Sequence, residues 1–443
     1  MDKSIIISFF FITIMILAIL PNSQSNIDII NDKDKIFLLS KNNINIEKSD
    51  KQTLNFGYKP TFDNKVTIKE KSTVSKIIDY PSSWNWKNLD GYDFTTSIKD
   101  QESCGACWAF AAMGALESVV NIKEQKFFDK DFSEQYLISC CNEGSCNGCE
   151  GGWAYDAYIW LDKEDRIADE KDYPYTGSDD PCKSGSWPEY IIENPFIDAS
   201  PSSIDTIKLA LMRKGPLVVA MYASDNFYYN YDKGVYRNIN EANYKLKKDD
   251  LNHEVVVIGF KDTPDNILYD GYWICKNSWG TDWGENGYFK LAYGYCLIDN
   301  SEIISPNYNP INAPETKIEV NTNKIHFNKG EKTKTFIIKN TGDYDSKLIW
   351  WINPSSELLN NIKSISPEKG VIKGGQQVSV TLTIDWERGI SGNLRVQEYG
   401  GSFNSDKIIS VTTPVCKNIN IQNKLIQSLF SRYPFLDFLT NLL

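Results

Sequence analysis

The chain is poor in histidine, with two in 443 residues. Any chemistry that uses an imidazole as acid or base therefore depends on His253 or His326. Basic residues are also outnumbered: 47 Lys and Arg stand against 58 Asp and Glu, which gives a net charge of −11, and no long basic block occurs. Little in the chain would neutralise a phosphate backbone, so we expect no nucleic-acid partner.

Long apolar runs are equally scarce, and the one that occurs spans residues 5–20. Lys3 precedes it, and the small residues Ser23 and Ser25 follow it. This pattern is typical of a cleaved secretory signal, which we place at residues 1–25. The run is short for a membrane span and lacks a stop-transfer flank, so we expect no span in the mature form; an uncleaved anchor is the alternative. The protein is expected to be secreted, extracellular or at the cell surface.

Nine of the ten cysteines fall between Cys104 and Cys296. In an exported protein such clustering predicts disulfide bonds. Two residues separate Cys104 from Cys107, and two separate Cys146 from Cys149, which is also the spacing of zinc ligands. The export signal, with a matching His and Asn downstream, counts against zinc, and we expect no metal site.

Composition divides most of the chain into segments. Residues 26–80 are polar and rich in Asn, Lys and Asp, which is typical of a loosely packed pro-segment or spacer. Dense apolar patterning with most of the cysteines predicts a folded domain over residues 81–305. A linker rich in Pro and Asn follows at 306–314. Residues 417–443 have apolar residues at roughly helical spacing and predict an amphipathic tail.

Residues 315–416 predict an all-β domain. In 377–384 apolar and polar residues alternate, so one face of a strand would be buried. Similar stretches lie at 335–339, 347–352 and 407–411. Short strands at this spacing, separated by Gly, Asn, Asp and Ser, indicate a β-sandwich of about a hundred residues.

A cysteine at the start of a predicted helix is the first candidate for chemistry. Cys107 opens a helix that we expect to run to about Glu124. Free N–H groups and the helix dipole at its N-terminus favour a thiolate, which is the nucleophile that acyl transfer needs. An imidazole must lie close by to hold the ion pair and to protonate the leaving amine.

Of the two histidines, His253 is the better partner. His326 falls in the strand-rich C-terminal part, where a solvent-facing histidine is the ordinary interpretation. His253 stands at the start of an apolar strand, where the sheet behind it would hold the ring rigidly. Asn277 could accept a hydrogen bond from the imidazole, and Gln101 could add a donor to the N–H of Cys107 around a developing oxyanion.

These segments closely resemble the papain family of cysteine peptidases. The Cys-Gly-Ser/Ala-Cys-Trp signature ends at Trp108. The other matching motifs are Ser133-Glu134-Gln135, Gly148-Cys149-Glu150-Gly151-Gly152, Tyr173-Pro174-Tyr175, and the segment from Asn277 to Tyr288. The resemblance covers about residues 81–305. It implies a two-lobed α+β fold, with a helical lobe and a β-barrel-like lobe, followed here by the all-β domain.

The resemblance also implies a role for each matching residue. The catalytic set is Cys107 as nucleophile, His253 as acid–base partner, Asn277 as the residue that orients it, and Gln101 as oxyanion donor. The substrate-binding set is Gly151 and Gly152, whose backbone would pair with an extended substrate, Trp279, which would shield the Asn–His bond, and the pocket residues Trp153, Ala220, Leu251 and Ser301. That pocket would be apolar and would prefer a hydrophobic residue two positions before the cleaved bond.

The implied function is hydrolysis of peptide bonds in proteins or peptides through a thioester on Cys107, without a metal or organic cofactor. One alternative is a surface-binding or adhesion protein in which the peptidase is secondary. Another is acyl transfer to amines instead of water, which would use the same residues.

The resemblance implies disulfide pairs as well. The expected pairs are Cys104–Cys149, Cys140–Cys182, Cys141–Cys146 and, in place of a missing family partner, Cys275–Cys296. Cys416 would stay free.

The C-terminal domain resembles immunoglobulin-like modules of the BACON type, on Asn340-Thr341-Gly342 and the stretch 365–380. Such modules are appended to exported enzymes and can bind glycans or proteins; a spacer or stabilising appendage is the alternative. Because Trp350 and Trp351 are adjacent in a predicted strand, we expect one to face the core and the other to be exposed for ligand contact.

Three departures from the papain pattern stand out. Glu102 occupies a position that is usually glycine. The stretch between His253 and Asn277 is long, which predicts an enlarged surface loop at 261–269. The 26–80 segment is short for an inhibitory pro-segment and lacks the family's helix pattern, so the sequence does not support self-inhibition by it.

Overall fold

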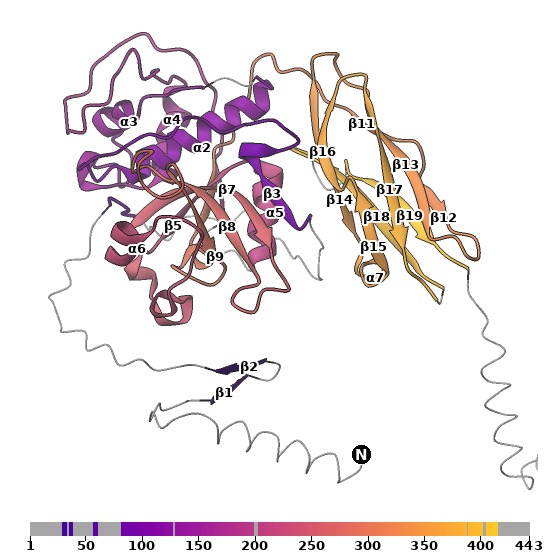
Figure 1. Cartoon of the computed structure of the whole chain (residues 1–443). Coiled ribbons are helices and arrows are strands. Elements are labelled where there is room, and N and C mark those ends of the chain that lie inside the picture. Colours follow the sequence, from indigo (N-terminus) through magenta and orange to yellow (C-terminus); the bar gives the residue numbers. More distant parts are fainter. Residues whose placement is uncertain are drawn as a thin grey trace, which may run out of the picture. The chain divides into compact units, whose positions relative to one another are not determined.

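The computed structural model of the chain (Figure 1) describes residues 29–32, 35–38, 56–60, 81–126, 129–198, 203–387, 389–401 and 405–414. The predicted signal, the tail at 417–443 and Cys416 lie outside these residues. Strands β1 (Ile29–Asp32) and β2 (Lys35–Leu38) form an antiparallel two-stranded sheet of their own. None of the helices that the structure describes is long and apolar enough to cross a bilayer.

A buried helix organises the first lobe. Helix α2 (Cys107–Glu124) is buried along nearly its whole length, as far as Ile122. Its Ala-rich, apolar sequence explains this, because a helix that is apolar on every side is stable only inside a core. It packs on α3 (Glu134–Cys140), α4 (Ala154–Glu164) and strand β7 (His253–Asp262).

The second lobe is built on one eight-stranded sheet of order β4-β10-β5-β7-β8-β9-β6, with β3 paired to β7. The first eight residues of β7 are buried. This strand pairs with β5 on one side, where Met221 lies opposite His253, and with β8 on the other. The remaining strands are β3 (Ser83–Asn85), β4 (Phe196–Asp198), β5 (Leu217–Met221), β6 (Val235–Tyr236), β8 (Gly271–Lys276), β9 (Tyr288–Ala292) and β10 (Ile303–Ser305).

Short helices complete the two lobes. Helix α5 (Ile204–Lys214) begins at the N-cap Ser203, whose hydroxyl accepts from the N–H of Thr206, and it ends before Gly215. The other short helices are α6 (Asp225–Asn230) and the 3-10 turns η1 (Trp86–Asn88), η2 (Gly148–Glu150), η3 (Ile239–Glu241), η4 (Asn243–Lys245), η5 (Lys248–Asp250) and η6 (Ile298–Asn300).

The C-terminal part is all β apart from one helical turn, α7 (Ser356–Leu359). It has two sheets, of order β11-β13-β17-β15 and β12-β19-β18-β14-β16. Val380, Leu382 and Ile384 of β17 are buried and their neighbours are more exposed, as the alternating pattern predicts. The strands are β11 (Ile318–Val320), β12 (Lys324–His326), β13 (Thr333–Asn340), β14 (Lys347–Pro354), β15 (Ile362–Ser366), β16 (Lys369–Lys373), β17 (Gln377–Ile384), β18 (Ser391–Glu398) and β19 (Lys407–Thr412).

The predicted organisation is confirmed at this level: an α+β domain precedes an all-β region. The four expected strands lie within β13, β14, β17 and β19. His326 is exposed on β12, as expected, with its Nδ1 3.0 Å from the Thr412 hydroxyl.

The expectation for the paired tryptophans is wrong, because both are buried. Trp350 points into the core between the two C-terminal sheets. Trp351 joins the core of the two preceding lobes instead, with its ring 5.6 Å from that of Trp84. The guanidinium of Arg213 lies 5.7 Å over the Trp351 ring. Trp351 is therefore an anchor between two parts of the chain and is not available to a ligand.

A buried ion pair reinforces this contact. Arg213, at the end of α5, lies 3.1 Å from Asp406, whose side chain is fully buried. Asp406 also accepts from Arg395 at 3.2 Å and from Gln397 at 3.0 Å. A buried carboxylate with this many donors is compensated only while all of them stay in place. The all-β region is thus docked through a desolvated polar contact.

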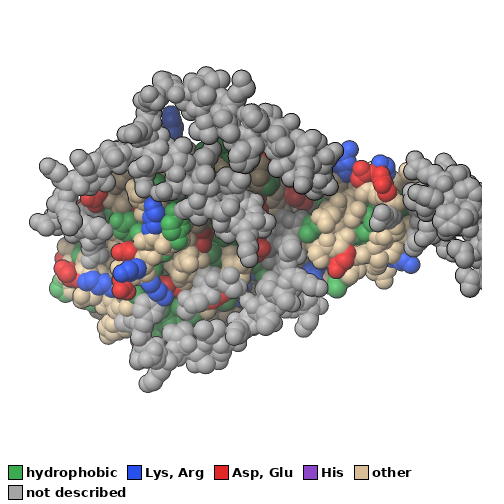
Figure 2. All heavy atoms as spheres, turned by 90° about the horizontal axis from the view of Figure 1, so that it is seen from below, with side chains coloured by type: hydrophobic (Ala, Val, Ile, Leu, Met, Phe, Trp, Pro, Cys, Tyr) green, Lys and Arg blue, Asp and Glu red, His purple; other side chains and the backbone are tan. Residues whose placement is uncertain are grey.

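Exposed ion pairs differ from this one in their surroundings. Lys332 and Asp385 lie 2.6 Å apart, but their side chains are 60% and 69% exposed. Where Figure 2 draws described residues, acidic and basic side chains are interspersed in this way. Water screens such pairs, so they contribute little to stability.

We predict that Asp406→Ala lowers the free energy of unfolding by about 3 kcal/mol, because it removes the carboxylate that balances the buried Arg213 charge. Chemical denaturation of the full chain measures this. Asp385→Ala is the matched control and should leave the unfolding midpoint essentially unchanged. Equal midpoints for the two variants would contradict the role assigned to the buried pair.

Candidate active site

The start of α2 places the Cys107 thiol against strand β7. Its Sγ accepts a hydrogen bond from the N–H of Glu254 at 3.3 Å, and the side chain is fully buried. Burial raises the pKa of the Cys107 thiol, the nearby carboxyl of Glu254 raises it further, and backbone N–H groups lower it. In this covered state burial outweighs the helix N-terminus, so the thiolate expected from the sequence is not favoured.

His253 stands at the first position of β7, held between Asn277 and Trp279. Its Nε2 lies 2.8 Å from the Asn277 Oδ1, so in this contact Nε2 carries the hydrogen and the amide oxygen accepts. The imidazole stacks on the Trp279 ring at 4.6 Å and has no exposed surface. Nδ1 has no hydrogen-bond partner among the described residues. Burial lowers the pKa of His253 to about 4, against the opposing effect of the Asn277 bond.

Gln101 contributes a second donor beside Cys107. Its Nε2 donates to the carbonyl oxygen of Phe56 at 3.2 Å, and the N–H of Cys107 donates to the same oxygen at 3.3 Å. The Gln101 amide is held by Ser278, whose hydroxyl donates to Oε1 at 2.7 Å. Two donors therefore converge on one peptide carbonyl next to the thiol, which is the arrangement of an oxyanion hole.

The peptide in this position belongs to the chain itself. Residues 56–60 lie along Gly152: its N–H donates to the Gly57 carbonyl at 2.7 Å, and its carbonyl accepts from Lys59 at 2.8 Å. Neither glycine of the motif leaves room for a side chain. A Cβ at Gly151 would lie 2.6 Å from the Gly57 oxygen, and one at Gly152 would lie 2.6 Å from the Trp108 ring. The Phe56 ring covers His253 at 5.0 Å.

The predicted pocket residues are all buried: Trp153, Ala220, Leu251 and Ser301. Two carboxylates that the sequence analysis did not single out adjoin them. Glu254 lies opposite Ala220 in the β5–β7 pair, and Glu302 follows Ser301. The Tyr58 hydroxyl donates to Glu302. The expectation of an uncharged pocket is therefore wrong, although both acidic residues adjoin matched positions and were visible in the sequence.

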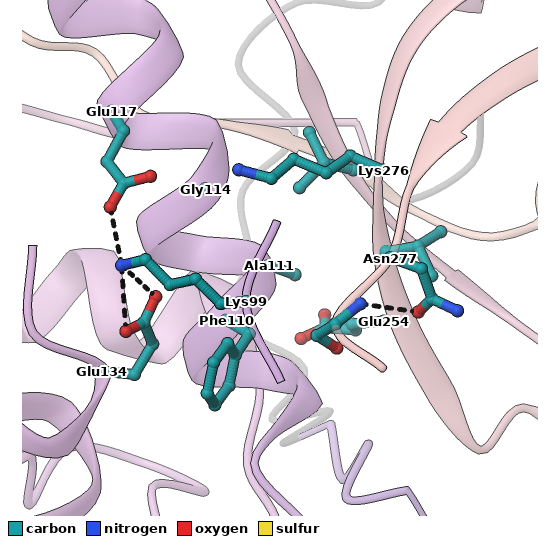
Figure 3. Close-up of a pocket in the computed structure, with 12 residues that line it drawn as sticks. Lys99, Phe110, Ala111, Gly114, Glu117, Glu134, Glu254, Lys276 and Asn277 are labelled. Carbon is teal, nitrogen blue, oxygen red and sulfur yellow. Dashed lines mark hydrogen bonds and ion pairs between the residues drawn. The ribbon is translucent and has the colours of Figure 1, made fainter. Parts of the chain in front are cut away.

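A buried charged cluster lies behind Asn277 (Figure 3). Lys99 donates to Glu117 at 3.0 Å and to Glu134 at 2.8 Å. Lys276, the residue before Asn277, donates to the Thr96 hydroxyl at 2.8 Å, and burial lowers its pKa. Because buried charges are stable only when paired, these contacts join α2 and α3 to the end of β8. They fix the strand end from which Asn277 projects.

Three of the four expected disulfides are present: Cys104–Cys149, Cys140–Cys182 and Cys141–Cys146. These disulfides exclude the zinc alternative, because Cys104, Cys146 and Cys149 are oxidised and cannot bind a metal as thiolates. Across the described part of the chain, no group of three or more His, Cys, Asp or Glu side chains is arranged to hold a metal.

The fourth expected disulfide, Cys275–Cys296, is absent, because both cysteines are buried free thiols. Cys275 is held within β8, opposite Val257 and Phe289 of the adjacent strands. The Cys296 thiol donates to Glu241 at 3.4 Å. The two thiols therefore have different neighbours in the core and are not bonded to each other.

Two of the departures from the papain pattern have a visible structural consequence. Glu102 has φ of 52°, a left-handed conformation that explains why glycine is usual there, and its N–H donates to Asp100 at 2.8 Å. The enlarged loop begins later than expected, because β7 extends through Asp262 before the chain turns at 263–270.

Comparison with known proteins places these features in a family. Residues 80–306, just over half of the chain, match the papain family cysteine proteases. Cathepsin L of Sarcophaga peregrina is 35% identical over 215 residues, which cover 48% of this chain and 60% of that protein. Cathepsin L2 of Homo sapiens is 35% identical over 218 residues, covering 49% and 62%. Cysteine proteinase 15A of Pisum sativum is 34% identical over 250 residues, covering 52% and 63%.

The chain therefore spans about three fifths of the length of these relatives. The matched region contains the thiol of α2, the imidazole of β7 and the amide that binds it. On this evidence the chain belongs to the papain family of cysteine proteases.

Proposed function

We propose that the protein is a secreted cysteine peptidase that hydrolyses peptide bonds through a thioester on Cys107. One observation carries the proposal: the Phe56 carbonyl oxygen accepts from both Cys107 and Gln101. A substrate carbonyl in that position would have its carbon beside the thiolate. Its oxygen would lie where two donors stabilise the negative charge that develops during attack.

The residues divide the reaction between them. The Cys107 sulfur attacks the carbonyl carbon, a C–S bond forms, and the carbonyl electron pair moves to the oxygen. Protonated His253 gives its Nδ1 proton to the amine nitrogen as the C–N bond breaks. A water molecule, deprotonated by the same ring, then cleaves the thioester and releases the acid. Asn277 keeps the ring oriented throughout through its bond to Nε2.

Residues 56–60 fit the role of an inhibitor. The acyl part of a substrate would place its second residue before the cleaved bond in the pocket of Trp153 and Ser301. Here the pocket partner Glu302 binds Tyr58, which is the second residue after Phe56. The segment therefore runs through the site in the direction opposite to a substrate. This supports a zymogen, which the length and pattern of the 26–80 segment did not suggest.

Secretion and the role of the all-β region are part of the proposal. Three disulfides and the predicted signal at 1–25 support export. Proteins or peptides are the proposed substrates. The contacts of Trp351 and Asp406 favour an immunoglobulin-like region that stabilises the peptidase over an adhesion module that binds surface glycans or proteins.

Transfer to amines is a second reaction that the same residues permit. Product analysis in the presence of an added amine would separate it from hydrolysis.

We predict that an epoxide inhibitor of active-site thiols labels Cys107 once residues 56–60 have been removed. His253→Ala should abolish the labelling, because the thiol then loses its base. Mass mapping of peptides locates the label. The buried thiols Cys275 and Cys296 are internal controls and should stay unmodified. A folded, processed protein that takes no label at Cys107 would refute the proposed function.

We predict that Gln101→Ala lowers kcat about 100-fold or more with little change in KM, because the donor acts mainly on the developing oxyanion. Steady-state kinetics on a fluorogenic peptide measure both constants. Ser97→Ala, in the loop before Gln101, is the control, since the structure ties that residue to Asp129 through its backbone N–H alone. A rise in KM at constant kcat would assign Gln101 to ground-state binding instead.

We predict that residues 56–60 leave the site as the pH falls from about 6.5 to 4. With the segment in place the pKa of His253 is about 4, whereas an uncovered imidazole titrates near 6.5. The closed form therefore binds fewer protons in this range and loses stability as the pH falls. Burial raises the pKa of Glu254, and the neighbouring Glu302 carboxyl raises it further, so this group is the second one that titrates differently in the closed form.

The inactive variant Cys107→Ala allows this release to be measured without self-cleavage. An added peptidase should cut near residues 56–60 at least about ten times faster at pH 4 than at pH 7, after correction for its own pH profile. In Cys107→Ala/His253→Asn the rise should be much smaller, because the titrating ring is gone. The same rise in both variants would exclude His253 as its source.

A further inference from the structure

Glu254 is a buried acidic residue in direct contact with the nucleophile. It follows His253 on β7, and its backbone N–H donates to the Cys107 sulfur at 3.3 Å. Only 1% of its surface is exposed. Its carboxyl is directed at the start of α4, where Oε2 accepts from the N–H of Ala154 at 3.1 Å. A titratable group is therefore held beside the thiol by two separate elements of the fold.

The Glu254 carboxyl is neither fully hydrogen-bonded nor balanced by a cation. Its Oε1 has no hydrogen-bond partner among the described residues. The charged groups that act on it are those of Glu302 and Asp156, and both are acidic. A dry carboxyl beside like charges keeps its proton to a higher pH than an exposed one. Glu254 thus changes its charge well above the range in which a surface glutamate does.

Titratable groups approach Glu254 from every element packed around it. They are Cys107 on α2, Asp156 and Tyr158 on α4, Glu302 before β10, and Tyr58 in the covering segment. Acids and neutral donors make up this whole set. An ionised Glu254 would therefore meet no positive charge among these neighbours.

The nearby lysines bind other groups. Lys248 lies 3.9 Å from the Glu302 Oε2. Lys99 lines the same small cavity as Glu254 but donates to the carboxylates of Glu117 and Glu134. Lys276 donates to the Thr96 hydroxyl at 2.8 Å, and in Figure 3 its amino group is directed at α2, next to Gly114, and not at Glu254.

A charge on Glu254 would act on the thiol more than on the imidazole. Burial, and after it the Glu254 carboxyl, raises the pKa of Cys107. The pKa of His253 is set instead by burial and by the bond to Asn277. A negative Glu254 thus disfavours the thiolate without stabilising the imidazolium to the same extent. The thiolate–imidazolium pair would be less populated.

Removal of residues 56–60 leaves this arrangement in place. Tyr58 binds Glu302, so its departure takes no hydrogen bond from Glu254. Glu302 and Asp156 belong to the folded lobes and remain beside the carboxyl. The same electrostatic relation therefore holds in the processed protein, where the thiol is available for reaction.

We propose that Glu254 is a positioning residue that makes Cys107 sensitive to pH: its neutral carboxyl tolerates the thiolate, and its ionised carboxylate opposes it. This rests on the proposed function and names a regulation of the same site. As the pH rises, Glu254 releases its proton to solvent, the thiolate population falls, and acylation slows. The peptidase is thereby restricted to acidic conditions by a third group, in addition to the catalytic pair.

The test measures how fast iodoacetamide alkylates Cys107 in the processed protein between pH 5 and pH 8. This reagent is small and neutral, so its rate follows the thiolate and does not depend on substrate recognition. The wild-type rate divided by that of Glu254→Gln should fall at least about threefold over this range, because only the wild type gains a like charge beside the sulfur. Glu357→Gln, on helix α7 of the all-β region, is the matched control and should follow the wild type.

Glu302→Gln gives the opposite shift and excludes a purely structural effect. Without the neighbouring charge Glu254 loses its proton more easily, so the fall in rate should lie about half a pH unit or more below that of the wild type. A general loosening of the site would not move the two variants in opposite directions.

The outcomes separate this inference from the proposed function. A folded, processed protein that takes no label at Cys107 at any pH fails the proposed function. A labelled protein whose ratio falls by less than the expected factor overturns the role of Glu254. A fall that Glu302→Gln leaves unmoved, or moves to higher pH, overturns it as well. Should Glu254→Gln not fold, the wild type and Glu302→Gln are compared directly, and identical pH profiles overturn the same role.

Discussion

The packing of helix α2 on strand β7 is the contact on which the site depends. Cys107 begins the helix and His253 begins the strand, so the two groups meet only because these elements lie against each other. Gly114 of the helix faces Val256 of the strand, where an added Cβ would be 3.7 Å from the Val256 side chain, within ordinary van der Waals contact. The strand is in turn held by hydrogen bonds on both sides, which gives the imidazole a rigid base.

The two catalytic groups carry no charge while residues 56–60 cover the site. Burial raises the pKa of the Cys107 thiol and lowers that of His253 to about 4, so both groups are neutral under the Phe56 cover at neutral pH. The ion pair that catalysis needs is stable only when water or a substrate dipole replaces that cover. The same close packing that positions the pair thus keeps it inactive while residues 56–60 are bound, and inhibition needs no distortion of the catalytic geometry.

Most of the buried charged side chains discussed above are paired with one another. Lys99, Glu117 and Glu134 pair with one another behind the site, and Arg213 pairs with Asp406 where the all-β region docks. Each of these clusters is satisfied within the protein, so its effect is to lock elements together. The carboxylates of Glu254 and Glu302 differ, because one oxygen of each has no hydrogen-bond partner among the described residues.

The sequence alone determined what local pattern can determine. The bounds of α2 and β17 were predicted nearly to the residue, because helices and strands depend on near neighbours in the chain. The choice of His253 as the base needed only the small number of histidines. Only the tertiary structure decided that Trp351 is buried against Trp84, that Cys275 and Cys296 stay apart, and that Tyr58 meets Glu302. The last pair is separated by 244 residues. Such contacts follow from how distant segments pack and from which groups packing removes from water, and neither is encoded in spacing or composition.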